Sequence, residues 1–221
     1  MDPLRGEFSE SRTAYSRKLI TREEAVEAVK KAVSKLGGDV SKEDRKKYAK
    51  ILLDIVEQGK TPREAMGFPL EDIAAIYNFA YSYYSKGQYK EAIELYKMLA
   101  TLDPTYPNFA TSLGVCYHQQ KDYEKAIAAY TLAITYSTRD PIPYYYLYDC
   151  YMHINEKLVA GMMIAYAIHE AGDQEKYKKI KERSQKLYAA LIEEAEGAAS
   201  TAAAKPVGEK GEPLTKKEKV L

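Results

Sequence analysis

Two stretches of the chain repeat the same pattern of aromatic and apolar residues. Residues 88–104 read QYKEAIELYKMLATLDP, and residues 122–138 read DYEKAIAAYTLAITYST. Both place Tyr, Ala-Ile and Tyr at the same offsets, and 34 residues separate the two copies. One helical pair cannot bury its own apolar face, so a chain that repeats such a unit stacks the copies. The repeat therefore constrains the fold more than any other feature of the sequence.

A period of 34 residues is typical of the tetratricopeptide helix–turn–helix. Three units can be laid in register, with starts near Ile73, Pro107 and Pro141. Four columns of this alignment are largely apolar: Phe79, Leu113 and Leu147; Tyr83, Tyr117 and Tyr151; Ala92, Ala126 and Ala160; Tyr96, Tyr130 and Ile164. We predict an all-α fold, a tetratricopeptide superhelix of three repeats with N-terminal helices and a C-terminal capping helix.

Small residues in the first helix of a unit predict how closely its second helix approaches. Ala80 and Gly114 occupy the same column of the first two units, where a short side chain allows close contact. The third unit has Tyr148 in that column, which departs from the pattern. We therefore expect the third unit to pack differently from the first two.

The remaining segments complete the predicted organisation. We expect residues 1–20 to be disordered, residues 21–60 to form N-terminal helices, and residues 61–172 to form the three repeats. Residues 173–196 predict a capping helix, because apolar residues recur along them at helical spacing. Residues 197–221 are rich in Ala, Gly, Pro, Lys and Glu, so we expect a disordered tail.

The first N-terminal helix carries a capping signal and an apolar stripe. Thr21 followed by Glu24 predicts a capping box, and the pair Gly37 and Gly38 predicts the end of the helix. The stripe is made of Ala25, Val29, Val33 and Leu36. A second helix is predicted from Ser41 to Gly59.

Charge and cysteine usage limit the classes of function. The chain has 33 Lys and Arg against 32 Asp and Glu, so nothing favours nucleic acid or an anionic membrane as a partner. Its most apolar run, residues 158–168, is too short to span a bilayer, which takes about 20 residues. The N-terminus shows no secretory signal, and two cysteines suggest a reducing compartment. We expect a soluble protein without direct membrane insertion.

The sequence contains few patterns that are typical of catalytic, cofactor-binding or metal-binding sites. It has no phosphate-binding Gly-rich loop, and its three histidines show no metal-ligand spacing. Cys150 and His153 could share a helix face, and Cys116 and His118 lie one unit away. A zinc or thiol site is one interpretation, but burial of both cysteines in one repeat column is the favoured one. We predict no catalytic residue, no metal and no cofactor, and therefore no enzyme.

The first helix of each repeat has a second face, which lines the concave surface of a tetratricopeptide stack. We predict a peptide-binding groove there, made of Tyr77, Tyr81, Tyr84, Thr111, Val115, His118, Tyr145, Asp149 and Met152. Tyr dominates this set and charges are few, which suits an extended peptide with apolar anchors. The alternative is that some of these tyrosines pack under the N-terminal helices.

Three stretches together resemble a known family. They read IYNFAYSYYSKGQYKEAIELYKMLATLDP, NFATSLGVCYHQQKDYEKAIAAYTLAI and RDPIPYYYLYDCYMHINEKLVAGMMIAYAIHEAG. They are similar to the class II chaperones of type III secretion, the LcrH/SycD type, over about residues 60–172. Tyr77, Tyr81 and Tyr84 match groove-lining aromatics of that family, and Val115 and Cys116 match its small residues.

This resemblance implies a specific role. Such chaperones are not enzymes; they bind one or two hydrophobic translocator proteins in the bacterial cytoplasm and keep them soluble and competent for secretion. They hold a segment of the translocator in the concave groove and often dimerise through their N-terminal helices. The resemblance therefore implies that the apolar stripe of Ala25, Val29, Val33 and Leu36 is a dimerisation surface. The alternative function is a scaffold that joins folded partners through the convex face or the tails. A scaffold of that kind would tolerate replacement of Tyr81 and Tyr84.

Overall fold

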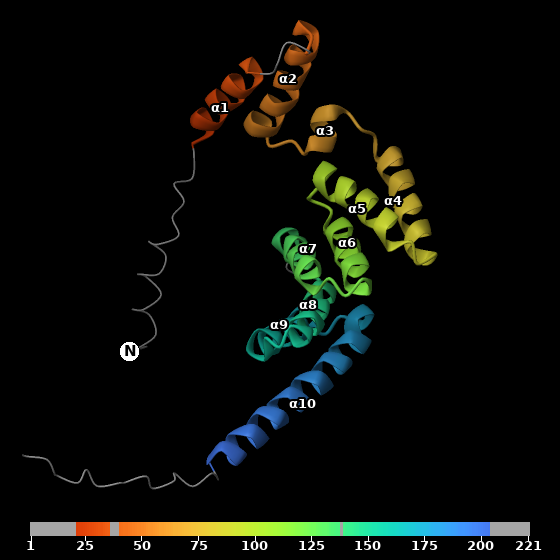
Figure 1. Ribbon diagram of the computed structural model, residues 1–221, viewed down its shortest axis with the longest axis vertical. Coiled ribbons are helices and arrows are strands. Elements are labelled where there is room, and N and C mark those ends of the chain that lie inside the picture. Colours follow the sequence, from red (N-terminus) through yellow and green to blue (C-terminus); the bar gives the residue numbers. More distant parts are fainter. Residues whose placement is uncertain (1–20, 36–39, 138, 204–221) are drawn as a thin grey trace, which may run out of the picture. The chain divides into compact units, whose positions relative to one another are not determined.

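The computed structural model describes residues 21–35, 40–137 and 139–203, without the side chains of residues 198–203 (Figure 1). The predicted disorder of residues 1–20 lies outside this part of the chain. So do Leu36 of the dimerisation stripe, the glycine pair that follows it, and residues 204–221.

Within the described residues every regular element is helical, as predicted. The elements are α1 (Arg22–Ser34), α2 (Lys42–Gln58), α3 (Pro62–Met66), α4 (Leu70–Ser85), α5 (Tyr89–Leu102), α6 (Pro107–Gln119), α7 (Tyr123–Tyr136), α8 (Pro141–His153), α9 (Lys157–Ala171), the 3-10 turn η1 (Glu175–Tyr177) and α10 (Lys178–Ala203). None of these helices is long and apolar enough to cross a membrane.

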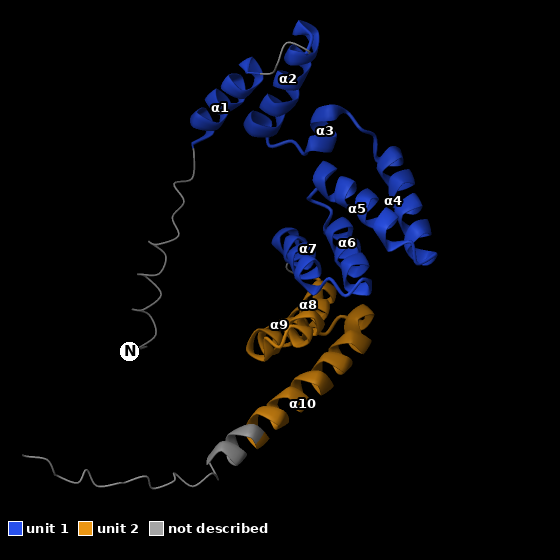
Figure 2. Ribbon diagram, viewed as in Figure 1, with its two compact units in different colours: residues 1–137 blue, residues 138–221 orange. Residues whose placement is uncertain are grey.

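The helices belong to two compact units (Figure 2). The first, Met1–Ser137, holds α1 to α7, and the second, Thr138–Leu221, holds α8 to α10. The boundary falls between the second and third predicted repeats.

Each N-terminal helix begins directly after a residue whose side chain caps it. The Thr21 side chain accepts a hydrogen bond from the Glu24 backbone N–H at 3.1 Å, and the Glu24 carboxylate accepts one from the Thr21 N–H at 2.8 Å. At the start of α2 the Ser41 hydroxyl accepts a hydrogen bond from the Asp44 backbone N–H at 3.0 Å, and α2 ends at Gly59 in the left-handed conformation, with φ 66°. Helices α1 and α2 pack on each other, but neither contains a fully buried residue.

In the first unit α4, α5, α6 and α7 pack in succession and form two repeats. Their shared core is centred on the columns predicted from the sequence, with Ala92, Tyr96, Leu113 and Ala126 all buried. Gly114 of α6 faces Tyr130 of α7 so closely that a Cβ atom would lie 2.5 Å from the ring. A small residue here is therefore required, as the repeat pattern predicts.

The second unit fills the equivalent columns of its repeat with side chains of different size. Helix α8 packs on α9, and α9 packs on α10. Tyr148 of α8 is buried where Ala80 and Gly114 stand in the first unit. One period after Tyr130, the facing column of α9 holds the smaller Ile164, which is fully buried. The large residue has thus moved from the second helix of the repeat to the first.

One column is not buried throughout. Leu113 and Leu147 are 8% and 1% exposed, but Phe79 is 66% exposed. Helix α4 packs on α5, and α3 also packs on α5, so the side of α4 that carries Phe79 is left open to solvent.

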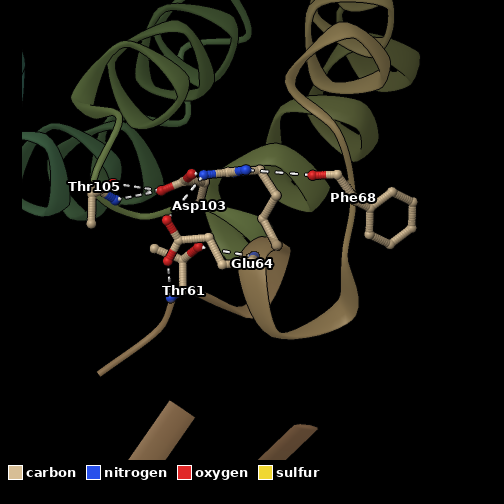
Figure 3. A network of polar contacts seen from close by, with 6 residues as sticks. Thr61, Glu64, Phe68, Asp103 and Thr105 are labelled. Atoms are coloured by element: carbon tan, nitrogen blue, oxygen red, sulfur yellow. Dashed lines mark hydrogen bonds and ion pairs between the residues drawn. The ribbon is translucent and has the colours of Figure 1, made fainter. Parts of the chain in front are cut away.

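A buried ion pair joins α3 to the end of the first repeat (Figure 3). The Arg63 Nε donates to the Asp103 carboxylate at 2.6 Å, and that carboxylate is 1% exposed. Thr105 donates its hydroxyl to the same carboxylate at 2.5 Å, while Arg63 also reaches the Phe68 carbonyl at 3.4 Å. The hydrogen bond that Arg63 donates to the Asp103 carboxylate raises the pKa of Arg63. This contact fixes the short helix α3 against the repeats.

The C-terminal helix corrects the predicted boundaries. The segment expected to be one helix over 173–196 begins with η1, and α10 starts at Lys178. Helix α10 then continues to Ala203, so residues 197–203 do not belong to a disordered tail. Its last turns are rich in Ala, the strongest helix former, which outweighs the cost of Gly197.

Candidate peptide-binding face

In the first unit the predicted groove residues lie on two helices. Tyr77, Tyr81 and Tyr84 come from α4, and Thr111, Val115 and His118 come from α6. All six are at least partly exposed, and Tyr81 is 57% exposed. None carries a formal charge when histidine is neutral, so this face is aromatic, polar and uncharged.

Tyr77 joins the two helices of the face. Its ring packs edge-on against Tyr96 at 5.6 Å between centroids and lies 5.9 Å from Phe109. Its hydroxyl lies 3.5 Å from the Ser112 Oγ of α6. Tyr77 is therefore partly buried in the core and partly exposed, and its contacts are with residues of the repeats.

Tyr81 and Tyr84 form the open part of the face. Their rings lie 6.2 Å apart, and Tyr84 also lies 5.7 Å from Tyr89 at the start of α5. The same ring pair recurs one period later, because His118 lies 5.6 Å from Tyr123 at the start of α7. In both repeats of the first unit the first helix thus ends on a ring that packs against a tyrosine of the next helix, which limits the freedom of that side chain before any partner binds.

Thr111 is partly committed to its own helix, because its hydroxyl donates to the Pro107 carbonyl at 3.0 Å. Its methyl group remains available to a partner. Val115 lies one turn further along α6 and is also partly exposed. The α6 part of the face is therefore apolar in character.

The corresponding residues of the second unit lie on α8. Tyr145 is partly buried between Tyr146, at 5.7 Å, and the guanidinium of Arg183 of α10, at 5.4 Å from the ring centroid. Burial raises the pKa of Tyr145, so it stays protonated. Asp149 lies 3.6 Å from His153 on its own helix, and Met152 is partly exposed. Asp149 is the one formally charged residue among the nine predicted positions.

The cysteines do not take part in this face. Cys116 and Cys150 are both fully buried, and burial raises the pKa of each thiol to about 12. The ring of His118 packs on Tyr123 and is partly exposed, whereas Cys116 points into the core. Within the described residues no three His, Cys, Asp or Glu side chains are grouped so that they could hold a metal ion.

Comparison with known families agrees with the repeats. Residues 80–121 match a family model described as TPR repeat, and residues 109–140 match one described as tetratricopeptide repeat. The two segments overlap around α6 and cover less than half of the chain.

Two curated proteins are similar in sequence to parts of this chain. The chain is 26% identical over 104 residues to the chaperone protein SicA of Salmonella typhimurium, which covers 47% of this chain and 63% of SicA. It is 20% identical over 148 residues to the low calcium response locus protein H of Yersinia pestis, covering 67% of this chain and 88% of that protein. The match to SicA thus spans less than two thirds of its length.

Solved structures share the fold. A type III secretion complex from Aeromonas hydrophila aligns with a TM-score of 0.62 and 17% identity, over 64% of this chain and 95% of the other. The Yersinia enterocolitica secretion chaperone SycD, solved with a peptide of the translocator YopD, aligns with a TM-score of 0.55 and 20% identity, over 57% and 95%. The resemblance to class II secretion chaperones is confirmed. SycD has also been solved as an alternative dimer, with a TM-score of 0.55.

Sequence reasoning did not find every residue of the face. Ser112, Tyr89 and Tyr123 were not predicted as site residues, yet they hold Tyr77, Tyr84 and His118 in place. A signal for two of them was present, because Tyr89 and Tyr123 are 34 residues apart at the turn of each repeat. The Ser112 contact depends on the approach of α4 to α6, which the period alone does not specify.

Proposed function

We propose that this protein is a cytoplasmic chaperone of a type III secretion system. Its substrate class is the hydrophobic translocator protein, one or two of which it keeps soluble and competent for secretion. It acts by binding rather than catalysis, and it needs no cofactor. Residues 61–172 carry the binding function, and residues 21–60 carry dimerisation.

The observation that carries this proposal is the uncharged aromatic face of α4 and α6. Tyr81 is 57% exposed on a helix whose neighbouring rings are already held by Tyr89 and Tyr96. Rigid, exposed tyrosines provide contact area at a low cost in conformational entropy, and their hydroxyls can bond to the backbone of an extended peptide. Tyr145, Asp149 and Met152 of α8 have the same proposed role in the second unit.

The physical role follows from mass action. A translocator has membrane-seeking segments that aggregate when they are free in water. A holder that binds such a segment lowers the concentration of the aggregation-prone form. The relatives support this reading, because SycD was solved with a translocator peptide in place and SicA is named as a chaperone.

Dimerisation is the second part of the proposal. Helices α1 and α2 contain no fully buried residue, and Tyr48 and Leu52 of α2 are 45% and 38% exposed. Ala25, Val29 and Val33 of α1 are only partly buried against α2. A second copy that covers these residues would supply the core that the helical hairpin lacks.

A titration tests the binding face. A fluorescein-labelled peptide from the chaperone-binding region of a translocator is added to the full chain, and fluorescence anisotropy reports binding. We expect the variant Tyr81→Ala/Tyr84→Ala to bind at least about tenfold more weakly, since each exposed ring is an anchor worth about 1–2 kcal/mol. Tyr136→Ala is the matched control, because Tyr136 is 48% exposed on α7, a helix that contributes none of the predicted groove residues. Equal affinity of both variants would contradict the proposal and favour a scaffold that binds elsewhere.

A further inference from the structure

The 34-residue register continues beyond the third repeat into the C-terminal helix. Cys116 and Cys150 occupy one buried column, and the next position in that column, Ser184 of α10, is also fully buried. Helix α8, the first helix of the third repeat, starts at Pro141, and one period later the 3-10 turn η1 starts at Glu175. The start of α10 therefore has the place of the first helix of a fourth unit.

The exposed columns of α10 agree with this register. The columns that hold Tyr148 and Tyr151 in α8 hold Glu182 and Gln185 in α10, and both of these are exposed. A terminal unit has no following helix to cover such columns, so polar residues are expected in them. The register thus holds at both buried and exposed positions of α10.

The groove columns predicted from the sequence can be carried one period further. In α10 they hold three basic residues, one in each column: Lys179, Arg183 and Lys186. The corresponding residues of α8 are Tyr145, Asp149 and Met152, and those of α4 are all tyrosine. Columns that are aromatic in the first repeat are therefore basic in α10.

One contact within the second unit shows that the basic residues of α10 lie beside the groove residues of α8. The guanidinium of Arg183 lies 5.4 Å from the centroid of the Tyr145 ring. Lys179 and Lys186 lie four residues before and three residues after Arg183, and residues at these spacings share one side of a helix. All three basic side chains are exposed. Tyr145 and these three residues are named the α8–α10 face.

The α8–α10 face has an excess of positive charge. Within the described residues none of its three cations takes part in an ion pair, whereas Lys178 and Lys181 of the same helix each pair with a carboxylate. Asp149 is the acidic residue of the groove columns here, and it lies 3.6 Å from His153. With Glu182 of the adjacent column included, three cations still stand against two carboxylates. An anionic group is therefore the complementary ligand.

We propose that the α8–α10 face binds an acidic stretch of the client, next to the client's apolar anchors. This inference rests on the proposed chaperone function and adds a charge preference to it. Carboxylates of the client would pair with cations that stay at the surface, so little desolvation is needed. Such pairs contribute to the choice of partner and to the rate of association more than to affinity.

A peptide is favoured over nucleic acid as the anionic ligand. A surface that binds nucleic acid neutralises several phosphates with Lys and Arg. Here a carboxylate, Asp149, lies among the three cations, and the whole chain has 33 Lys and Arg against 32 Asp and Glu. The cations also occupy columns whose members in α4 are exposed or half-buried tyrosines, which suit a polypeptide.

The test uses the full chain and the labelled translocator peptide of the anisotropy titration. The peptide is extended at either end by about four Glu or by about four Gln, so that the two versions differ in charge alone. At one of the two ends we expect the Glu version to bind about fivefold more tightly than the Gln version, and added salt should reduce this difference. Lys179→Glu/Lys186→Glu should abolish it, because two attractive charges become repulsive.

A matched variant makes the result specific to this face. Lys157→Glu/Lys178→Glu changes the net charge of the same unit by the same amount, at two exposed lysines outside the groove columns. It should keep the preference for the Glu version within about twofold of the wild-type value. Circular dichroism checks that each variant remains helical.

Four results would overturn the inference. If wild type bound the Glu and Gln versions equally while Tyr81→Ala/Tyr84→Ala weakened both, the charge preference would be wrong and the proposed function would stand. Equal loss of the preference in both charge variants would show that overall charge, not this face, is recognised.

The other two results concern the ligand. A single-stranded DNA oligonucleotide that bound wild type more tightly than the Glu version, and lost affinity in Lys179→Glu/Lys186→Glu, would identify nucleic acid as the ligand of this face. If wild type bound none of the peptides, the proposed function would fail together with this inference.

Discussion

At the scale of the residue, Gly114 allows the ring of Tyr130 to lie directly against the backbone of α6. A Cβ at this position would meet three ring atoms at 2.5–2.9 Å, and Tyr130 is fully buried. We expect Gly114→Ala to lower the free energy of unfolding by about 2 kcal/mol, since overpacking outweighs the gain in helix propensity. Urea unfolding measures the change. Gly197→Ala is the control, because nothing lies within 4 Å of its would-be Cβ and the variant should be neutral or slightly stabilising.

The Arg63–Asp103 pair gives a second residue-scale prediction. Replacing Arg63 by Met leaves the Asp103 carboxylate 1% exposed and without its cation. We expect a loss of about 3 kcal/mol in the free energy of unfolding, because an uncompensated buried charge is costly. Lys97→Met is the control, since the Lys97–Glu94 pair is exposed and should contribute far less. If both variants lost the same small amount, the buried pair would not stabilise the junction of α3 with the repeats.

The buried thiols predict a dependence of stability on pH. Burial raises the pKa of Cys116 and Cys150 from the ordinary 9.0 to about 12. Between these values the unfolded chain loses thiol protons that the folded chain keeps. The free energy of unfolding should therefore fall as the pH rises from 9 toward 12, and the thiols should not affect its pH dependence below pH 8. Urea unfolding at pH 8 and pH 10.5 measures this, and Cys116→Ala/Cys150→Ala should reduce the slope. An unchanged slope would show that other groups cause it.

At the scale of the element, much of the fold could be predicted from the sequence. Helix starts follow local chemistry, because the side chains of Thr21, Ser41 and Thr61 satisfy backbone N–H groups that the first helical turn leaves free. The small-residue column predicted the close approach of α6 and α7. The length of α10 could not be predicted from local patterns, because the composition of its polar, Ala-rich end resembles that of a disordered tail. The high helix propensity of Ala favours a helix there.

Other features depend on tertiary context and could not be predicted. Phe79 shares a column with two buried leucines, yet its exposure is set by what covers α4 rather than by the repeat. The Arg63–Asp103 pair joins residues 40 positions apart and follows no period. In the candidate site, the period identified which residues share a face, but the positioning contact of Ser112 with Tyr77 appears only once α4 and α6 are packed.

The α1–α2 hairpin carries the element-scale prediction. Val29 and Val33 remain partly exposed although they form the apolar stripe of α1. We expect Val29→Glu/Val33→Glu to convert a dimer to a monomer in analytical ultracentrifugation, because two buried charges would face each other across the interface. Lys30→Glu changes an exposed residue of the same helix and should leave the dimer intact. A dimer that survives both charges would move the interface away from α1.

At the scale of the whole molecule, the chain is two compact units of stacked helices that present two different surfaces. The α4–α6 face is uncharged and rich in tyrosine, which suits an extended segment. Helices α9 and α10 of the second unit enclose an apolar cleft lined by Leu158, Met162, Tyr188 and Ile192.

The most direct test of the central claim is a co-expression experiment with full-length translocators of a type III secretion system. The amount of translocator in the soluble fraction is measured with wild type, Tyr81→Ala/Tyr84→Ala and the control Tyr136→Ala. If the α4–α6 face holds the client, wild type and Tyr136→Ala keep the translocator soluble and in complex, while the double variant, still helical by circular dichroism, leaves it aggregated. If the double variant keeps the translocator as soluble as wild type does, the account of this face as a chaperone site is wrong.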